Sequence, residues 1–305
     1  MATVRIATPC FPPIPKDAVG LCCPPGIGDI SWLVSKMWSL SSRSGRQVYL
    51  STPGGIPQRS HQLVQLLPER YGIHWAGYTQ TETMDVIDLA RDTRLDELRE
   101  GEWHCVEVNT WLEAGKPLST WEPWLPTDYH YALDIPTEQV VRASELTDHL
   151  QGVDFGGIYV SNRDKARWPA WALWSTKEWC RVLLGIHEQH GIGYVLIGAE
   201  YDRDRIHDVA AVLGENRVPY VRCVGESLGT ALECLRRASM GLWYPSGIGI
   251  LGDVLNVQGV MLLPKPLQGM ERAFADPKNL DSGRYRAWTT PTPEGVLKWA
   301  EGLSL

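Results

Sequence analysis

The strongest constraint on the fold is a regular alternation of short apolar runs with amphipathic segments along most of the chain. The apolar runs are rich in Val, Ile and Leu and are bounded by Gly and Pro, which predicts buried strands. The segments between them repeat apolar residues at the spacing of a helix face. Strands and helices in strict alternation form parallel sheets covered by helices, because a parallel crossover needs a helix to return the chain. The sequence therefore predicts an α/β protein.

The predicted elements fall into two similar halves. In the first half we expect strands at residues 18–23, 47–51, 73–76 and 104–108, and helices at 29–41, 58–67 and 86–98. In the second half we expect strands at 158–161, 194–197, 220–223, 240–244 and 259–263, and helices at 176–190, 202–213, 227–238 and 248–256. An irregular aromatic stretch at 109–134 and a helix with connector at 135–154 separate the halves, and a last helix is expected at 293–303.

The length of 305 residues suits two domains of ordinary size. We predict a first Rossmann-like domain over residues 1–150, a second over 151–290, and a C-terminal helix over 291–305. Ligands of open α/β sheets bind at the carboxyl ends of the strands. We therefore expect a ligand cleft between the two domains, lined by strand-to-helix turns.

Composition excludes several classes of protein. With 44% hydrophobic and 21% charged residues, the chain is neither disordered nor fibrous. No apolar run approaches the ~20 residues of a membrane span, and the amino terminus lacks a signal-peptide pattern, so we expect a cytoplasmic protein without an integral membrane segment. Seven scattered cysteines without a Cys-x-x-Cys pair predict neither a disulfide framework nor a zinc site. We interpret Cys22 and Cys23 as small packed residues, the alternative being a reactive pair.

The charge balance bears on nucleic acid binding. A net charge of -7 disfavours a surface that follows nucleic acid over its whole length, although a local basic groove remains open. Asp202 and Asp204 resemble a metal-binding Asp-x-Asp pair, but they stand where a helix begins, and acidic residues are favoured there without a metal. We expect no metal site.

The turn after the first predicted strand is the first candidate site. Gly26 and Gly28 let the backbone approach a ligand and are candidate donor-binding residues, and Asp29 stands at the start of the following helix. Asp29 is either a helix N-cap or a general base directed into the cleft.

Three turns of the second half are candidate phosphate and nucleoside contacts. Backbone N–H groups at Ser246, Gly247 and Ile248 suit a diphosphate. Lys165 and Arg167 follow the first strand of this half and offer cations, or form a solvated loop. Gly198 ends the next strand, and Glu200 either accepts hydrogen bonds from ribose hydroxyls or caps the next helix.

The irregular stretch is dense in aromatic residues. These are Trp111, Trp121, Trp124, Tyr129, His130 and Tyr131, with Glu113 among them. Sugar rings and bases both stack on aromatic faces. The stretch is therefore either a platform for a substrate or the cover of a small satellite core.

These turns, in this order, resemble glycosyltransferase family 9, the ADP-heptose:lipopolysaccharide heptosyltransferases of the two-domain GT-B fold. The family's Gly-x-Gly-Asp turn is similar to the segment from Gly26 to Asp29, and its Lys-x-Trp-Pro segment to the one from Lys165 to Pro169. Gly198 to Glu200, Gly225 to Leu228, and Ser246 to Leu251 resemble its later motifs. The resemblance covers about residues 18–50 and 157–265.

Two departures from the family pattern bear on the site. Pro245 and Ile250 replace the Asp and His of the last motif, while the backbone N–H groups of that turn do not depend on these side chains. One extra residue separates Lys165 from Trp168, so either Lys165 or Arg167 is the cation at the diphosphate.

The resemblance implies an inverting, metal-independent glycosyltransferase that needs no cofactor and takes a nucleotide-diphosphate sugar as donor. It implies Asp29 as base, Lys165 at the diphosphate, Glu200 at the nucleoside, and Ser246 with Gly247 at the phosphates. The acceptor would bind the first domain at Trp111, Glu113, Trp121, Trp124 and His130. It would be a glycan, a lipopolysaccharide core or a hydroxylated base of DNA, since short divergent members also occur in bacteriophages. Alternatives are a GT-B-like protein that only binds a nucleotide or glycan, and a nucleotide-sugar epimerase.

Overall fold

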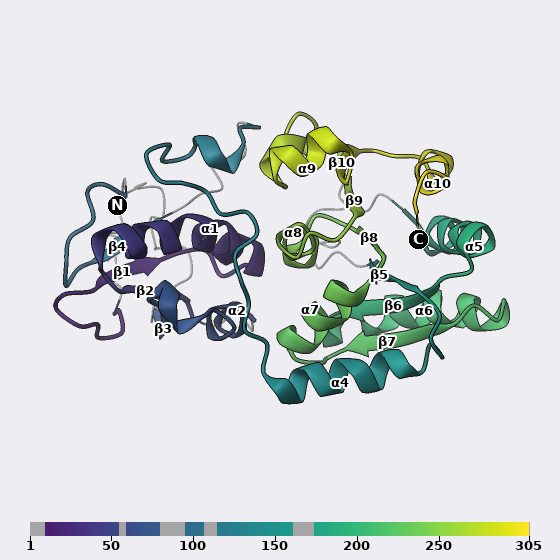
Figure 1. The fold of residues 1–305 in the computed structure, drawn as a ribbon, viewed down its shortest axis with the longest axis horizontal. Coiled ribbons are helices and arrows are strands. Elements are labelled where there is room, and N and C mark those ends of the chain that lie inside the picture. The colour runs from purple at the N-terminus through teal and green to yellow at the C-terminus, as the bar shows by residue number, and fades with distance from the viewer. Residues whose placement is uncertain (1–9, 55–58, 80–94, 107–114, 161–173, 305) are drawn as a thin grey trace, which may run out of the picture. The chain divides into compact units, whose positions relative to one another are not determined.

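The computed structural model describes residues 10–54, 59–79, 95–106, 115–160 and 174–304 (Figure 1). The chain forms two compact units. The first comprises residues 1–114 and 118–134, and the second comprises residues 115–117 and 135–305. Each unit contains one parallel sheet.

The first unit is built on a four-stranded sheet. Its elements are β1 (Val19–Cys22), α1 (Ile27–Ser44), β2 (Val48–Pro53), α2 (Ser60–Gln65), β3 (Ile73–Thr79) and β4 (Trp103–Cys105). The strand order is β3-β2-β1-β4, and every pair is parallel. Helices α1 and α2 pack against each other and against β3. The predicted strands are confirmed, with ends that differ by at most three residues; residues 107–108 of the strand predicted at 104–108 lie outside the described residues.

The second unit is built on a six-stranded parallel sheet. Its strands are β5 (Phe155–Tyr159), β6 (Gly193–Gly198), β7 (Tyr220–Val224), β8 (Met240–Trp243), β9 (Gly259–Leu263) and β10 (Tyr285–Thr289). Its helices are α4 (Thr137–Asp148), α5 (Thr176–His190), α6 (Arg203–Glu215), α7 (Leu228–Arg237), α8 (Gly247–Val254), α9 (Pro277–Ser282) and α10 (Pro293–Ala300). The strand order β10-β9-β8-β5-β6-β7 is that of a Rossmann fold.

Local sequence explains most of these boundaries. Helix α5 begins at Ser175, whose side chain accepts a hydrogen bond from the Glu178 N–H, while the Glu178 carboxylate accepts one from the Ser175 N–H. It ends at Gly191, whose left-handed backbone (φ 71°) suits glycine. Sequence reasoning predicted this helix with the same bounds, but it missed α9 and β10. The predicted helix at 86–98 lies mostly outside the described residues.

The helices of the second unit form two groups (Figure 1). Helices α5, α6 and α10 pack together, and so do α4, α7 and α8. A Cβ atom at Gly185 of α5 would come within 2.5 Å of Leu297 of α10, so the glycine allows the close approach of the C-terminal helix. Helix α4, which we expected at the end of the first domain, packs on α7 and lies in the second unit. The predicted assignment of functions to the two domains stays a prediction.

One large side chain in the core of the second unit, Trp243, is surrounded by glycines. Trp243, at the end of β8, is fully buried. A Cβ atom at any of four glycines of β8, α8 and β9 would overlap its ring; these are Gly241, Gly249, Gly252 and Gly259. The indole therefore occupies the space that four side chains would need, and this brings α8 close to the sheet.

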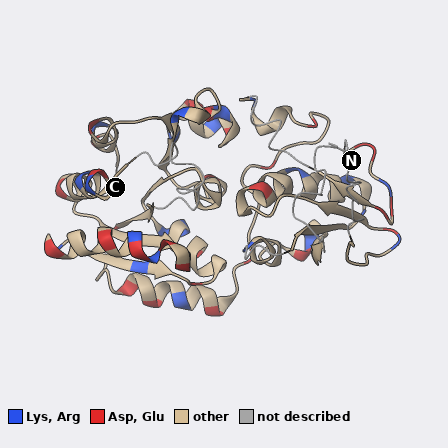
Figure 2. Cartoon of the chain, turned by 180° about the vertical axis from the view of Figure 1, so that it is seen from behind, with Lys and Arg blue, Asp and Glu red and all other residues tan. Residues whose placement is uncertain are grey.

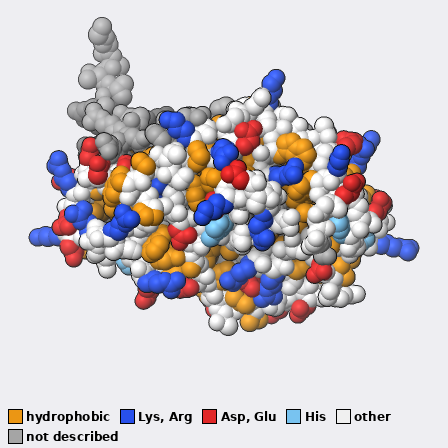
Figure 3. Space-filling model, turned by 45° about the horizontal axis from the view of Figure 1, so that its top comes forward, with side chains coloured by type: hydrophobic (Ala, Val, Ile, Leu, Met, Phe, Trp, Pro, Cys, Tyr) orange, Lys and Arg blue, Asp and Glu red, His pale blue; other side chains and the backbone are white. Residues whose placement is uncertain are grey.

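The surface carries charges of both signs. Figure 2 shows acidic and basic residues interspersed along the helices of the second unit. On the face in Figure 3, hydrophobic side chains form small patches separated by charged ones. Among the residues with described positions, no helix is both long enough and apolar enough for a membrane span.

The packing around Trp243 predicts opposite effects for two helical glycines. Gly252→Ala would place its Cβ atom 2.5 Å from the indole, so we expect the free energy of unfolding to fall by about 1–3 kcal/mol. Gly214→Ala in α6 is the matched control: its Cβ atom would lie 3.6 Å from the nearest atom, and alanine favours helix, so we expect a gain of about 0.4–1 kcal/mol. Urea unfolding measures both changes. A stabilising Gly252→Ala would contradict the packing account.

Candidate functional site

The second sheet changes its winding direction between β5 and β8. These strands are neighbours, with Tyr159 paired to Trp243 at their carboxyl ends, while the chain continues from β5 toward β6 on one side and from β8 toward β9 on the other. Such a switch point is where open α/β sheets bind ligands, because the two following loops diverge and leave a crevice. The predicted donor residues of the second unit follow β5, β6 and β8, while Gly26 and Gly28 follow β1 in the first unit. Lys165 and Arg167 lie outside the described residues.

The turn after β8 forms the N-terminus of α8. Ser246 is the N-cap, and its hydroxyl oxygen accepts a hydrogen bond from the Gly249 N–H (3.2 Å). Gly247 and Ile248 are the first two helical residues, whose N–H groups have no partner within a helix. Two N–H groups and a positive helix end suit an anion. The predicted turn is present, with Ser246 as its cap.

Glu200 lies in the turn after β6, the strand on the other side of β5 from β8. Its carboxylate forms an exposed ion pair with Arg203 (2.6 Å). It also lies against Gly225, where a Cβ atom would overlap it and where the backbone is left-handed (φ 76°). The alternative interpretation of Glu200 as a helix cap is wrong, because Asp202 accepts the hydrogen bond from the Ala199 N–H (2.9 Å) at this helix start. Asp202 thus opens a helix, as expected.

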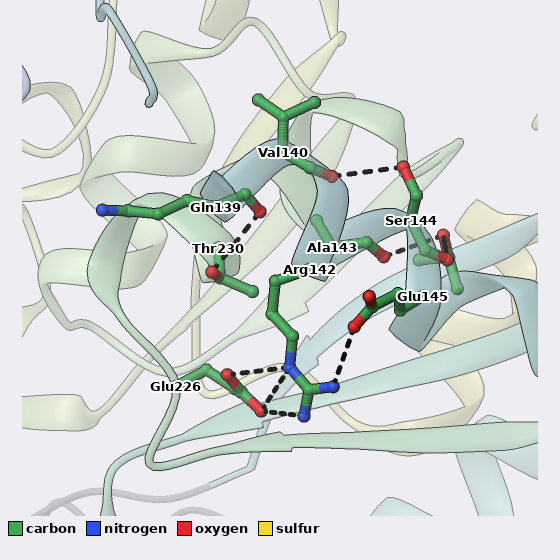
Figure 4. A network of polar contacts seen from close by, with 9 residues as sticks. Gln139, Val140, Arg142, Ala143, Ser144, Glu145, Glu226 and Thr230 are labelled. Atoms are coloured by element: carbon green, nitrogen blue, oxygen red, sulfur yellow. Dashed lines mark hydrogen bonds and ion pairs between the residues drawn. The ribbon is translucent and has the colours of Figure 1, made fainter. Parts of the chain in front are cut away.

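Helix α4 holds the loop that follows β7, a role that sequence reasoning missed. Figure 4 shows Arg142 of α4 between Glu145 and Glu226, at 3.2 Å and 2.7 Å. Ser227 caps α7 by accepting the Thr230 N–H, and it donates to the Gln139 side chain (2.9 Å). The loop that contains Gly225, next to Glu200, is therefore fixed by side chains of α4.

In the first unit, Asp29 lies at the carboxyl end of β1. Gly26 is the N-cap of α1 and Asp29 is in its first turn, so the alternative interpretation of Asp29 as N-cap is wrong. The carboxylate folds back against Gly26, where a Cβ atom would overlap it. Ser60 of α2 donates a hydrogen bond to the Pro25 carbonyl and so holds the turn from the other side. Gly28 is buried in the same turn.

The neighbouring cysteines, Cys22 and Cys23, are fully buried. Burial, and then the negative charge of Asp29, raises the pKa of the Cys23 thiol well above its usual value. Contact with the Cys105 thiol and burial raise the pKa of Cys22 likewise. A thiol needs a lowered pKa to act as a nucleophile at neutral pH. The interpretation of Cys22 and Cys23 as small packed residues is confirmed.

The aromatic stretch lies along α1 between Trp124 and Tyr131, and its chain direction is opposite to that of the helix. Arg43, near the end of α1, donates to the Trp124 carbonyl (3.0 Å). Ser31, near its start, shares a hydrogen bond with the Tyr131 hydroxyl (2.8 Å). Helices rise ~1.5 Å per residue, so the Trp124 end lies on the order of 20 Å along α1 from Asp29. The structure thus fastens Tyr131, the neighbour of His130 in sequence, to the same end of α1 as Asp29, and fastens Trp124 to the other end.

Burial divides the predicted acceptor residues. Trp121 is 5% exposed and Tyr131 is 2% exposed, so both rings are packed inside the protein, as the satellite-core alternative expects. Trp124 is 41% exposed, and His130 is exposed. Trp111 and Glu113 lie outside the described residues.

Lys36 anchors this stretch, and sequence reasoning missed it. It is fully buried in the middle of α1 and donates to the carbonyl groups of Leu125 (2.8 Å) and Glu122 (3.3 Å). Burial lowers the pKa of Lys36 to about 8, an effect that the charge of Glu122 opposes. A lysine at an apolar position of an otherwise amphipathic helix was the available signal.

Comparisons with known proteins identify the fold. No family model and no curated protein matches the sequence. The E. coli ADP-heptose lipopolysaccharide heptosyltransferase II is similar in structure, with a TM-score of 0.61, 13% identity, and coverage of 92% of this chain and 97% of that one. A glycosyl transferase family 9 protein from Veillonella parvula has a TM-score of 0.56 and 14% identity, with coverage of 95% of this chain and 98% of that one. S. aureus MnaA, solved with UDP, has a TM-score of 0.53 and 10% identity, with coverage of 94% of this chain and 87% of that one.

These similarities show that the chain has the fold of family 9 glycosyltransferases, so the resemblance seen in the sequence is confirmed for the fold. Among the described residues, no group of three or more His, Cys, Asp or Glu side chains is placed to hold a metal ion.

The buried amine predicts a pH-dependent stability. The folded state loses the Lys36 proton near pH 8 and the unfolded state near pH 10.5, so the unfolded state binds more protons between these values and stability rises with pH there. Relative to Lys36→Met, the wild type should therefore gain on the order of 3 kcal/mol of unfolding free energy across this window. Denaturant unfolding at several pH values measures the difference. Lys16→Met, at an exposed position, is the control, and parallel curves for wild type and Lys36→Met would refute the shift.

The satellite core predicts unequal effects of two tryptophan substitutions. Trp121→Ala should lower the free energy of unfolding by about 3–5 kcal/mol, because it leaves a cavity under the segment. Trp124→Ala should cost less than about 1 kcal/mol, since its indole is exposed and bonds only to the neighbouring Glu122 side chain among the contacts described (2.7 Å). Equal losses in urea unfolding would show that the two rings are packed alike.

Proposed function

We propose that this protein is an inverting, metal-independent glycosyltransferase that uses a nucleotide-diphosphate sugar. The observation that supports the proposal best is the position of the donor residues. Glu200 and the turn from Ser246 to Ile248 follow the two strands that flank β5 at the switch point, in a fold shared with family 9 glycosyltransferases. In this proposal the two Rossmann-like units face each other across the cleft of a GT-B enzyme.

Charge on the leaving nucleoside diphosphate needs stabilisation in the transition state. The N–H groups of Gly247 and Ile248 supply two fixed donors, which are effective because they need no reorganisation as the charge develops. Lys165 or Arg167 adds a cation. Glu200 receives hydroxyl groups of the ribose, beside Gly198 and Gly225. No divalent ion is needed for this division of labour.

Asp29 acts as the general base. Its carboxylate deprotonates the acceptor hydroxyl while the oxygen attacks the anomeric carbon from the side opposite the diphosphate, which gives inversion in one displacement. The N-terminal turn of α1 stabilises the carboxylate as an anion before it takes the proton.

The acceptor binds the first unit near the start of α1. His130 is exposed there and is the best placed of the described acceptor candidates, whereas an acceptor at Asp29 that also reached Trp124 would span on the order of 20 Å. A glycan, a lipopolysaccharide core and a hydroxylated base of DNA all remain candidate acceptors. A DNA acceptor would bind more weakly as salt rises, and a neutral glycan would not.

A second candidate function is nucleotide or glycan binding without catalysis. It is favoured by Pro245 and Ile250, which replace the acidic residue and histidine of the family motif. A nucleotide-sugar epimerase is a third, since the S. aureus MnaA structure with UDP has a similar fold.

Nucleotide binding and turnover together test the proposal. Among ADP, UDP, GDP and their sugars, at least one should raise the melting temperature of the wild type, because a ligand of the native state stabilises it by mass action. Asp29→Asn should keep this shift and reduce sugar transfer by a factor on the order of 100 to 10,000.

Asp17→Asn, at an exposed position of the same unit, is the control and should keep full turnover. Absence of any nucleotide shift would refute the donor site. Binding without transfer to any acceptor would favour the binding protein. Unchanged turnover in Asp29→Asn would remove Asp29 as the base and leave Glu113 or His130.

A further inference from the structure

Tyr285 connects the edge of the second sheet to the start of α8. It lies in β10, a strand that no sequence motif marked, and it is fully buried. Its hydroxyl oxygen accepts a hydrogen bond from the Trp243 indole N–H (2.6 Å), and its O–H donates to the Gly249 carbonyl (2.9 Å). An indole N–H only donates and a carbonyl only accepts, so the direction of this relay is fixed.

The relay holds the first turn of α8 at one residue from two sides. The Gly249 N–H bonds to Ser246, and its carbonyl accepts from Tyr285. A Cβ atom at Gly249 would lie 2.6 Å from the indole, so the helix rests directly on Trp243. The position of Tyr285 therefore determines how far α8 extends over the end of β8 and how its first N–H groups are directed.

The Tyr285 hydroxyl is a permanent donor. Burial, and then the nearby charge of Asp253, raises the pKa of Tyr285 well above its usual value. Asp253 itself accepts hydrogen bonds from the Asp276 N–H (2.6 Å) and the Asn279 side chain (2.8 Å). The hydroxyl thus keeps its proton at neutral pH, and both hydrogen bonds of the relay stay in place.

We propose that Tyr285 is a positioning residue for the diphosphate of the donor: through Trp243 and Gly249 it orients the N–H groups of Gly247 and Ile248 toward the phosphate oxygens. The inference rests on the proposed function, since it assumes that this helix start binds the diphosphate. Hydrogen bonds to an anion need donors at about 2.7–3.1 Å, and a displacement on the order of 1 Å costs much of their effect. Tyr285 touches neither the nucleotide nor the reacting atoms.

The test compares two tyrosines that lose the same atom. Tyr285→Phe removes the relay and keeps the ring. Tyr194→Phe is the matched control, because Tyr194 is also fully buried in the same sheet and donates to the Leu183 carbonyl (2.6 Å), away from α8. Tyr194→Phe leaves one buried acceptor without its donor, whereas Tyr285→Phe also leaves the Trp243 indole N–H without its acceptor, so we expect both variants to lose melting temperature and Tyr285→Phe to lose more.

Affinity separates them. Calorimetric titration with ADP, UDP or GDP, whichever stabilises the wild type, should give a Kd raised on the order of 10-fold in Tyr285→Phe and by less than 2-fold in Tyr194→Phe. The matching nucleoside should bind both variants with unchanged Kd, because it lacks the phosphates. Equal nucleotide affinities in the two variants would overturn the inference. A wild type that binds no nucleotide would refute the proposed function instead.

A measurement on the wild type covers the case in which Tyr285→Phe does not fold. The ¹⁵N-indole resonance of Trp243 should move when the nucleoside diphosphate is added, and stay in place with the nucleoside alone. A resonance that ignores the diphosphate would show that the relay is not coupled to phosphate binding.

Discussion

The contact between the Trp243 indole and the glycines around it determines how the candidate donor site is built. The ring fills the space between β8, α8 and β9, where side chains at Gly241, Gly249, Gly252 and Gly259 would overlap it. Close packing of this kind leaves no freedom for α8 to slide, because any shift would open a void or force a clash. The N-terminal turn of α8 is therefore placed by the core and not by the loop before it. One of these glycines, Gly249, belongs to the glycine-rich turn that sequence reasoning interpreted as a phosphate-binding motif.

This arrangement explains how the site tolerates the departures from the family pattern. Ile250 replaces a polar family residue and is 6% exposed, so it packs into the core of the second unit. The N–H groups of Gly247 and Ile248 depend on the chain path, which Ser246 and Tyr285 hold. Binding through backbone donors survives loss of side chains as long as the helix stays in place. The candidate donor site is thus shaped more by packing than by polar side chains.

The sequence predicted the elements with a clear local signal and missed those that depend on neighbours. Strands such as Gly259–Leu263 are uninterrupted apolar runs, and helix Thr176–His190 has a capping box and a terminal glycine. Strand Tyr285–Thr289 is short, contains Arg286 and shows neither a continuous apolar run nor a regular alternation, and helix Pro277–Ser282 is too short for a period to show. The sequence does not distinguish Trp121 from Trp124, because tryptophan serves both substrate stacking and core packing. Only their exposed fractions in the structure distinguish the buried ring from the exposed one. Lysine side chains are usually solvated, so the sequence did not predict that Lys36 is buried. Its burial depends on the carbonyl groups of Glu122 and Leu125, which come from a distant part of the chain.

Helix α1 sets the positions of the aromatic segment in the first unit. It begins at Gly26 beside the candidate base and ends at Gly45, and the aromatic segment is fastened to it at Ser31, Ser35, Lys36 and Arg43. Because a helix is stiff and each fastening fixes one position, Tyr131 is held at the start of α1, Asp128 and the carbonyl groups of Glu122 and Leu125 at its middle, and Trp124 near its end. If the acceptor binds at the start of α1 as proposed, its specificity should depend on the residues near His130, which is exposed, while the buried Trp121 is constrained by packing. A change of acceptor could then occur without disturbing the base or the core, since the two ends of the segment are attached to α1 separately.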